Sequence, residues 1–381
     1  MFVKTEEQEL LLESLRQLFK RDFPESYLAG IDNTPGGYAY DLAKALLDNG
    51  YTLLGVPEEF GGTPASVTTL CLVNEELGRQ CTPYSSLNSS LTIGDMLAFG
   101  TEAQKKLVID AVKETGIPPC ALGITEPQAG SDDSAIASTY TRRNGKVYIN
   151  GHKTFMSGAG KSPYGLVFAK NPNAPDPRKA ISCWLVKMDL PGITMSELHK
   201  IGNHATPTYE VYFDEVEVEE DALVGKEGEG FFIIMKNFEP ERLLISAGSL
   251  GNAEAVFEDA ARYANQRIQF GKPIGSFQLI QEKITDMYLK IENMRNMIYS
   301  AAADIDEGKS ARISSAMCKY YCARALFEVA DDAMQVLGGI GYTNDHRVSR
   351  VWRDARANRI GGGTDEIMIH ILGRQLLKQF G

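Results

Sequence analysis

The chain of 381 residues lacks several features that would point to particular protein classes. Its 39 lysines and arginines stand against 50 acidic residues, and the net charge of −11 argues against nucleic-acid binding, which needs a basic face that releases counterions. No apolar run reaches about 18 residues, so we expect no transmembrane helix. The start, MFVKTEEQELLLESLRQLF, lacks the apolar core of a signal peptide, which favours a cytoplasmic protein.

Cysteine pairs with metal-ligand spacing are also missing. The six cysteines form no CxxC pair, so neither a zinc ribbon nor a thioredoxin-like motif is indicated. Cys318 and Cys322 are four residues apart in a helical pattern, but two thiols without further ligands are typical of buried packing residues. No G-x-G-x-x-G follows an expected strand, so a Rossmann site is not supported. We therefore expect no metal site.

What the chain does contain is a change of periodicity along its length. Before Pro118, apolar residues recur at helical spacing, as in residues 5–20. Short strand patterns follow, and Asn144-Gly145 within TYTRRNGKVYING is the pair favoured by a type I′ hairpin turn. Long helical stretches then return. We expect an α+β fold with an N-terminal helical domain (1–119), a middle β-barrel or sandwich domain (120–226) and a C-terminal four-helix bundle (227–381).

Two candidate binding stretches lie at or in the expected β domain, and clefts between domains are common ligand sites. LGITEPQAGSD (122–132) leaves backbone N–H groups free for a flavin edge or a phosphate, although a tight turn capped by Ser131 fits equally well. GHKTFMSG (151–158) offers a ring that would stack on a planar cofactor and a hydroxyl that would bond to it. The same stretch also reads as an ordinary strand end.

Three more stretches interrupt the C-terminal helices. NQRIQFGKPIGSFQ (265–278) contains Arg267, which suits either a pyrophosphate or the C-terminus of a helix. QVLGGIGYT (335–343) and RIGGGTDEI (359–367) are glycine-rich breaks that let backbone approach a ligand. Thr364 in the last break is a candidate N-cap, and the helix start behind it would attract an anion.

In this order and at these separations, the stretches resemble the acyl-CoA dehydrogenase family. The resemblance covers nearly the whole chain, from the first helix through VPEEFGG (56–62) to GGGTDEI (361–367). FEDAARYANQRIQFGKPIG (257–275) and SRVWRDAR (349–356) are similar to bacterial crotonobetainyl-CoA reductases and related enteric acyl-CoA dehydrogenases. The resemblance implies FAD, an acyl-CoA or enoyl-CoA substrate, an electron-transferring flavoprotein as partner, and a homo-oligomer that we expect to be a tetramer.

The resemblance also implies roles for individual residues. Positions that would hold the cofactor, with its ADP half shared with a neighbouring subunit, are Leu122, Ile124, Thr125, Ser131, Phe155, Ser157, Arg267, Phe270, Gln278, Gln335, Gly338, Gly339, Thr364 and Glu366. Positions that would face the substrate are Ser131, Phe238, Arg242 and Gly362. Two positions depart from the family pattern: Gln128 replaces the first glycine of EPGAGS, and Phe155 stands where many members have tryptophan.

The catalytic base is expected at Glu241. Many members of the family carry a glutamate where this chain has Gly362, and others carry it on a helix before an arginine, which Glu241-Arg242 matches. An apolar run follows Glu241, and a carboxylate shielded from water is a stronger base. We expect Glu241 to exchange the α-proton of the thioester while the β-hydrogen moves as a hydride to or from flavin N5.

Other activities stay open at this point. A same-fold FAD enzyme of different chemistry, such as an acyl-CoA oxidase or a desulfinase-like lyase, remains an alternative because Gly362 lacks the usual side chain. A non-catalytic scaffold on the same fold is a further one. The sequence leaves the acyl group undecided between crotonobetainyl, short or medium aliphatic, and aryl-acrylyl, and it leaves the direction of the reaction undecided as well.

Overall fold

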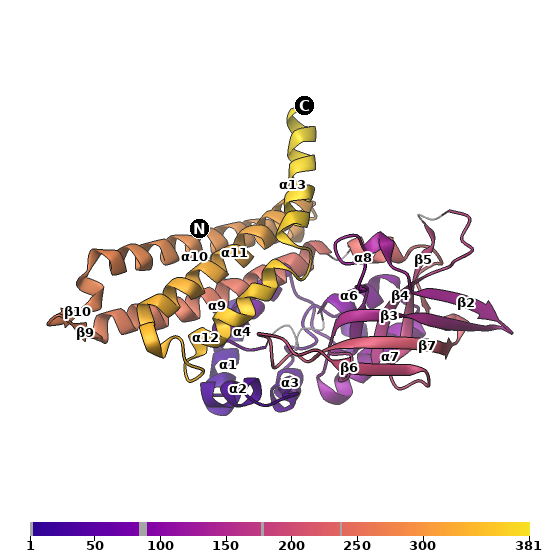
Figure 1. Cartoon of the computed structure of the whole chain (residues 1–381), viewed down its shortest axis with the longest axis horizontal. Helices are drawn as coiled ribbons and strands as arrows, with labels where there is room; N and C mark the ends of the chain where they lie inside the picture. The colour runs from indigo at the N-terminus through magenta and orange to yellow at the C-terminus, as the bar shows by residue number, and fades with distance from the viewer. Residues whose placement is uncertain (1–2, 84–89, 177–178, 237) are drawn as a thin grey trace.

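The computed structural model describes residues 3–83, 90–176, 179–236 and 238–381, and its elements follow the order expected from the periodicity (Figure 1). Helices come first, a sheet occupies the middle of the chain, and long helices return at the end. The N-terminal helices are α1 (Glu6–Asp22), α2 (Glu25–Asp32), α3 (Tyr40–Asp48), α4 (Val67–Arg79), α6 (Ser90–Phe99) and α7 (Glu102–Thr115). The predicted α+β architecture is confirmed.

Two of the N-terminal helices begin where the sequence supplies a capping box. Thr5 and Thr101 each accept a hydrogen bond from the backbone N–H three residues on, at 3.2 and 3.3 Å. The glutamines at those positions, Gln8 and Gln104, reach back to the N–H of the capping residue. These reciprocal bonds satisfy donors that the start of a helix leaves free. The beginnings of α1 and α7 are therefore set locally.

The middle of the chain forms one eight-stranded sheet in which β1 pairs in parallel with β4 and the others run in the order β6-β7-β3-β2-β4-β5-β8. Its strands are β1 (Cys120–Gly123), β2 (Thr139–Arg143), β3 (Lys146–Ser157), β4 (Tyr164–Lys170), β5 (Ile181–Lys187), β6 (Ile193–Glu197), β7 (Thr208–Val218) and β8 (Leu223–Val224). One face packs on α6, α7 and the short helix α8 (Gly230–Lys236). The other face buries a second apolar cluster that includes Trp184 and Tyr140. The expected middle β domain is therefore present.

The β2–β3 hairpin forms as the Asn-Gly pair predicts. Asn144 and Gly145 have φ values of 53° and 76°, both left-handed, as a type I′ turn requires. Further along β3, the register against β7 shifts between Lys153 and Met156. Such a bulge bends a strand and re-aims its side chains, and this one lies at the edge of the candidate site.

Long helices make up the C-terminal part. Its elements are α9 (Phe238–Gln266), the short hairpin β9 (Ile268–Gln269) and β10 (Lys272–Pro273), α10 (Gln278–Asp306), α11 (Arg312–Leu337), α12 (Arg347–Ala355) and α13 (Asp365–Phe380). Helices α9, α10 and α11 pack against one another, and α4 from the N-terminal part packs on α9 and α10. Helix α13 contacts α11 and then projects from the rest of the molecule (Figure 1).

Glycines allow α4 and α9 to cross at short range. A Cβ added at Gly78 would lie 2.2 Å from the carbonyl oxygen of Gly248, and one added at Gly251 would lie 1.8 Å from that of Glu75. A side chain at either glycine would push the two helices apart, because only glycine tolerates backbone this close. The crossing fixes α9, and with it the first turn of α9, against the N-terminal helices.

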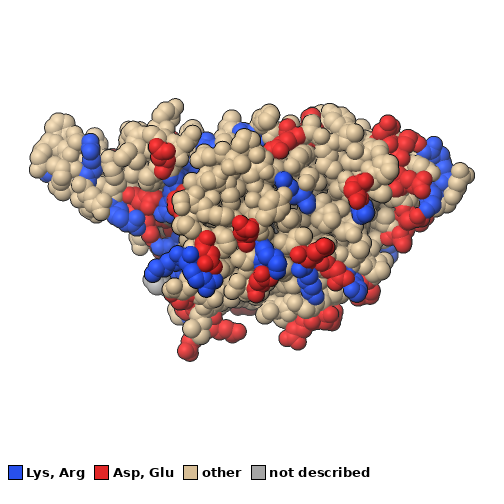
Figure 2. All heavy atoms as spheres, turned by 90° about the horizontal axis from the view of Figure 1, so that it is seen from below, with Lys and Arg blue, Asp and Glu red and all other residues tan. Residues whose placement is uncertain are grey.

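The surface of the molecule seen from below mixes acidic and basic side chains without a continuous basic patch (Figure 2). All six cysteines are buried and unpaired. In the part of the chain that the structure describes, no group of three or more His, Cys, Asp or Glu side chains is arranged to hold a metal. The described helices include none that is both long enough and apolar enough to cross a bilayer.

Candidate active site

Glu241 lies in the first turn of α9, next to the N-terminal helices. Pro240 suits this position, because its missing N–H would have no intrahelical partner there. The Glu241 side chain lines a cavity of about 150 Å³ whose other walls come from α4, α6 and the loop at residues 52–56. These walls are mostly aliphatic, with Leu70 and Ile93 among them. An acidic group therefore faces an apolar pocket.

The carboxyl group of Glu241 is desolvated and incompletely paired. Burial raises its pKa to about 7, against the opposing charges of Arg242 and Lys319 and with a contribution from Asp95. Its Oε2 is buried and makes no hydrogen bond within the described part of the chain. A carboxyl group with this pKa exchanges protons readily near neutral pH, as a general base or acid must.

Arg242, which follows the candidate base, is itself only 4% exposed. Its guanidinium carbon lies 5.1 Å from the centre of the Phe238 ring, within the range of a cation–π contact. Burial lowers the pKa of Arg242, and the charges of Glu241 and Glu239 oppose that shift. Its Nε is buried and, among the described residues, lacks a hydrogen-bond partner. The start of α9 thus holds a carboxyl group and a guanidinium group that both keep unused hydrogen-bonding capacity among the described residues.

The turn that precedes α13 passes close to this part of α9. Gly362 and Gly363 have φ values of 65° and 94°, which residues with side chains rarely adopt. A Cβ at Gly362 would lie 3.2 Å from Cδ1 of Ile245, one helical turn after Glu241. Thr364 then caps α13 by accepting the N–H three residues on, at 3.2 Å. Gly362, where the family resemblance would place a glutamate in many other members, therefore lies next to the helix that carries Glu241.

A buried acid holds the loop that follows β1. Glu126 is 3% exposed and accepts a hydrogen bond from the Lys153 ammonium at 2.7 Å. It also accepts from the N–H and hydroxyl of Ser138, at 3.0 and 2.6 Å, and from the Gln128 amide at 2.6 Å. Lys153 donates in addition to the Ile124 carbonyl at 3.2 Å. Burial alone would raise the pKa of Glu126, but Lys153 and the other donors bring it down to about 2.

The bulge in β3 turns Phe155 outward. Its φ of 54° is unusual for a bulky residue, and its side chain is 65% exposed. The N–H of the neighbouring Thr154 donates to the Thr125 carbonyl at 2.9 Å, which ties the bulge to the loop after β1. Ser157 at the end of β3 is exposed as well. An open aromatic ring, nearby hydroxyls and a fixed backbone fit one side of a flavin ring.

The structure brings some of the predicted site residues together. Leu122, Ile124 and Phe238 pack, half-buried, against one core cluster, so the loop after β1 meets the start of α9. Ser131 is exposed in that loop, and Glu366 is exposed in the first turn of α13. A second group is exposed at the other end of the molecule, around β9–β10 and the end of α11 (Figure 1): Arg267, Phe270, Gln278, Gln335, Gly338 and Gly339. One chain alone does not unite the two groups.

Charged residues that the sequence reasoning overlooked lie in or beneath the site: Glu126, Lys153, Lys319 and Asp95. The two lysines carried a detectable signal, because each interrupts an apolar face. Lys319 lies three residues after Ala316 and three before Cys322, both buried on α11, and Lys153 faces inward on β3. A lysine at such a position is unfavourable unless it is paired, and this marks it for a specific role.

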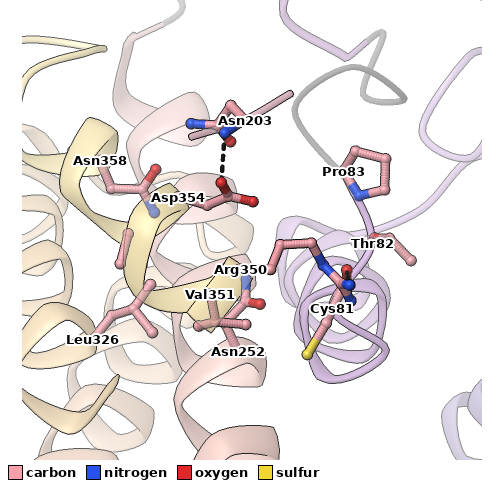
Figure 3. A pocket seen from close by; sticks show the side chains of 11 residues that line it. Cys81, Thr82, Pro83, Asn203, Asn252, Leu326, Arg350, Val351, Asp354 and Asn358 are labelled. Atoms are coloured by element: carbon pink, nitrogen blue, oxygen red, sulfur yellow. Dashed lines mark hydrogen bonds between the residues drawn. The ribbon is translucent and has the colours of Figure 1, made fainter. Parts of the chain in front are cut away.

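A second hollow, of about 20 Å³, lies where the N-terminal, middle and C-terminal parts meet (Figure 3). Several of the polar residues that line it make hydrogen bonds within the described chain. The Asn203 N–H donates to the Asp354 carboxylate, and Arg350 donates to Glu25 at 3.0 Å and to the Cys81 carbonyl at 3.5 Å. The volume suits about one water molecule. This hollow shares no lining residue with the Glu241 cavity, and the hydrogen bonds around it join the three parts of the chain.

Comparisons with known proteins cover all three parts of the chain. Family models for the N-terminal, middle and C-terminal domains of acyl-CoA dehydrogenase match residues 5–113, 121–216 and 228–377. The probable acyl-CoA dehydrogenase YdiO of Escherichia coli K12 is 53% identical over 379 residues, which span 100% of this chain and 99% of that protein.

Two solved structures share the fold over almost their full length. Butyryl-CoA dehydrogenase from Megasphaera elsdenii is 31% identical with a TM-score of 0.89, over 99% of this chain and 100% of that one. A chain from work on the electron transferring flavoprotein of Acidaminococcus fermentans and flavin-based electron bifurcation is 32% identical with a TM-score of 0.91, again over 99% and 100%. The family, the enzyme class and FAD as its cofactor are as expected from the sequence. The chain belongs to the acyl-CoA dehydrogenase family, whose members are FAD-dependent oxidoreductases.

Proposed function

We propose that the chain interconverts an acyl-CoA and its 2,3-enoyl-CoA, with Glu241 as the group that exchanges the α-proton. The supporting observation is the Glu241 carboxyl at the wall of an apolar cavity, with a pKa of about 7 and an Oε2 free of protein partners within the described residues. Bound FAD supplies the acceptor or donor of the hydride at the β-carbon. The proton leaves the α-carbon for Glu241, and its electron pair enters the new C=C bond.

Other groups of the chain would prepare the thioester for this step. The turn at Gly362 would offer a backbone N–H to the thioester carbonyl, so that negative charge on its oxygen is stabilised as it develops. Arg242 opposes the rise in the pKa of Glu241 and so keeps part of the carboxyl ionised at neutral pH. In the opposite direction the same carboxyl, when protonated, would return the α-proton to an enoyl-CoA.

The lining of the cavity favours an aliphatic acyl group. Among the described residues that line it, Glu241 is the one charged residue and none is aromatic. A trimethylammonium group would gain from an aromatic cage or a second carboxylate, which these walls do not supply. About 150 Å³ exceeds the roughly 10–15 Å³ that one water needs, so a short alkyl chain has room. We propose a short- to medium-chain aliphatic acyl-CoA rather than a crotonobetainyl or aryl-acrylyl thioester.

The electron partner and the assembly belong to the same proposal. The similarity to a chain from work on an electron transferring flavoprotein supports such a flavoprotein as the partner. Cofactor positions at both ends of one chain support a homo-oligomer, with a tetramer as the expected form, in which a neighbouring copy supplies the ADP-binding end. Exposed apolar residues at the far end of the bundle and on α13, among them Phe270 (92%) and Phe380 (82%), would be covered there.

The proposal is tested with purified protein, its flavin spectrum and the variant Glu241→Gln. Saturated acyl-CoAs of rising chain length should bleach the flavin of the wild type without forming peroxide, and Glu241→Gln should keep the flavin yet react about 10²- to 10⁴-fold more slowly, because it lacks a base. Glu239→Gln is the matched control from the same helical turn. Glu239 accepts the Ala311 N–H at 3.2 Å, and that variant should stay active.

Three outcomes would contradict the proposal. Full activity of Glu241→Gln with acyl-CoA would remove Glu241 from the mechanism. Peroxide formed in step with bleaching would favour an acyl-CoA oxidase, and a released sulfur oxyanion from a sulfinyl thioester would favour a lyase. Bleaching by crotonobetainyl or aryl-acrylyl substrates alone, tested in both directions with a reduced flavoprotein, would overturn the aliphatic assignment.

A further inference from the structure

Lys319 is a fully buried lysine that the proposed chemistry leaves without a role. It lies on α11 with 1% of its surface exposed, and its ammonium donates to the carbonyl oxygen of Gly363. A buried ammonium is unfavourable by several kcal/mol unless nearby groups compensate it. A neutral donor of similar length could hold the same carbonyl with a smaller desolvation penalty. The charge itself therefore calls for an explanation.

The surroundings of Lys319 connect it to the proposed base. A Cβ at Gly362 would lie 4.0 Å from Cε of Lys319 and 3.2 Å from Cδ1 of Ile245, so the glycine turn is held between α11 and α9. Charged groups that act on Lys319 come from two of the helices that pack against α11: Asp365 and Glu366 on α13, and Arg242 and Glu241 on α9. Those that act on Glu241 are Arg242, Asp95 and Lys319.

The glycine turn depends on a contact of this kind. Gly362 and Gly363 both have left-handed backbone conformations, and a short glycine-rich turn loses much conformational freedom on ordering. The hydrogen bond from Lys319 restrains the carbonyl of Gly363, one residue from the N–H that we assign to the thioester oxygen. One side chain thus touches the proposed carbonyl-binding turn and carries a charge beside the base.

We propose that Lys319 is a positioning residue for proton transfer, which holds the Gly362–Gly363 turn in place and favours the ionised form of Glu241. The inference rests on the proposed function, because it assigns the proton to Glu241. Burial lowers the pKa of Lys319 to about 8, opposed first by Asp365, so the ammonium is largely charged at the pH where Glu241 titrates. Loss of that charge makes Glu241 harder to ionise.

Two replacements separate the charge from the hydrogen bond. Lys319→Gln removes the charge but keeps a donor for the Gly363 carbonyl, whereas Lys319→Met removes both. In acyl-CoA oxidation, the wild-type kcat/KM should rise with pH through an inflection near 7, and both variants should move that inflection to higher pH. Only Lys319→Met should also raise KM, because the turn loses its anchor. Lys283→Met is the control: Lys283 pairs with Asp332 at 2.6 Å on the same bundle, and its loss should leave the inflection in place.

A second measurement does not depend on turnover. In a double-mutant cycle of Glu241→Gln and Lys319→Gln, the shifts in thermal unfolding midpoint should be non-additive at pH 7.5 and additive at pH 5, where Glu241 is protonated in the folded chain. This cycle applies even if Lys319→Met fails to fold. An unmoved inflection in flavin-loaded Lys319→Gln, or additivity at both pH values, overturns the role of Lys319 while leaving the base assignment intact. Full activity of Glu241→Gln would instead overturn the proposed function itself.

Discussion

Glu126 and Glu241 both carry buried carboxyl oxygens in the candidate active site, yet their pKa values move in opposite directions, to about 2 and to about 7. Both carboxyl groups are partly removed from water, which on its own raises a carboxyl pKa. At Glu126 the Lys153 ammonium, two donors from Ser138 and a backbone N–H outweigh that effect. At Glu241 the neighbouring charges only moderate it, and one oxygen has no partner among the described residues.

The difference separates a group that shapes the site from a group that reacts. A carboxylate that accepts several hydrogen bonds stays ionised across the working pH range and holds its partners in fixed places. A carboxyl with few partners titrates near neutrality and can give or take a proton. Under the proposed function, the loop around Glu126 would offer a fixed surface for the cofactor, and the start of α9 would offer a proton acceptor for the substrate.

The largest effect on stability should come from breaking the Glu126–Lys153 pair. Lys153→Met leaves a buried carboxylate without its counter-ion and should lower the free energy of unfolding by about 3–5 kcal/mol. It should also weaken FAD retention, because the Ile124 carbonyl loses its donor. Urea unfolding and the flavin content of the purified protein measure both effects. Lys187→Met is the matched control, since Lys187 pairs with Asp189 on the exposed end of the same sheet and should matter by less than about 0.5 kcal/mol.

A free energy of unfolding for Lys153→Met within about 1 kcal/mol of the wild type would contradict this contrast between the two glutamates. A double variant, Lys153→Met with Glu126→Leu, tests the contrast more sharply. Replacing both members of a buried ion pair by apolar groups is often close to neutral, so the double variant should recover much of the stability that the single variant loses. Recovery of stability without recovery of FAD would assign the pair to shaping the loop.

Glu241→Gln should have the opposite consequence and stabilise the folded chain. The folded pKa of Glu241, about 7, lies above its unfolded value of about 4.3, so wild-type stability falls as pH rises between those values. Glutamine carries no such penalty. The variant should match the wild type near pH 4 and exceed it by about 3 kcal/mol near pH 8. Unfolding measured at both pH values tests this, and a gap independent of pH would show that the carboxyl is not held in a desolvated place.

Much of the fold follows from local patterns in the sequence. The helical stripes, the Asn144-Gly145 turn and the glycine-rich breaks each specify their own conformation, and the structure has them where they were expected. Helix α2 was missed, since its eight residues carry too short a period to stand out. Glu241 could be predicted from its motif. Its neighbour Lys319 is 78 positions away in the chain, and Lys153 is 27 positions from its partner Glu126, so no local pattern encodes either contact.

The far end of the cofactor site was named from the family resemblance, but its place relative to the other site residues does not follow from the sequence alone. The residues around β9–β10 and the end of α11 lie at the opposite end of the molecule from the eight-stranded sheet (Figure 1). In the proposed oligomer, a second copy would bring them to the same ligand. Motif order along one chain carries no information about which copy supplies which motif. The local chemistry of each stretch could be predicted from its residues, whereas the sharing of the ADP half with a neighbouring subunit came only from the family resemblance.

The smallest expected effect concerns the bulge in β3 that carries Phe155. Phe155 has a φ of 54°, where a side chain raises the energy by about 1 kcal/mol relative to glycine. Because the ring is 65% exposed, little burial is lost when it is removed. The free energy of unfolding of Phe155→Gly should therefore exceed that of Phe155→Ala by about 1 kcal/mol, although alanine is usually the more stable of the two residues. Both variants should hold FAD equally weakly, as followed by flavin fluorescence, because both lack the ring. If Phe155→Ala proved more stable than Phe155→Gly, the backbone at this bulge would not be strained. The outward direction of Phe155 would then not depend on a strained backbone conformation retained for cofactor binding.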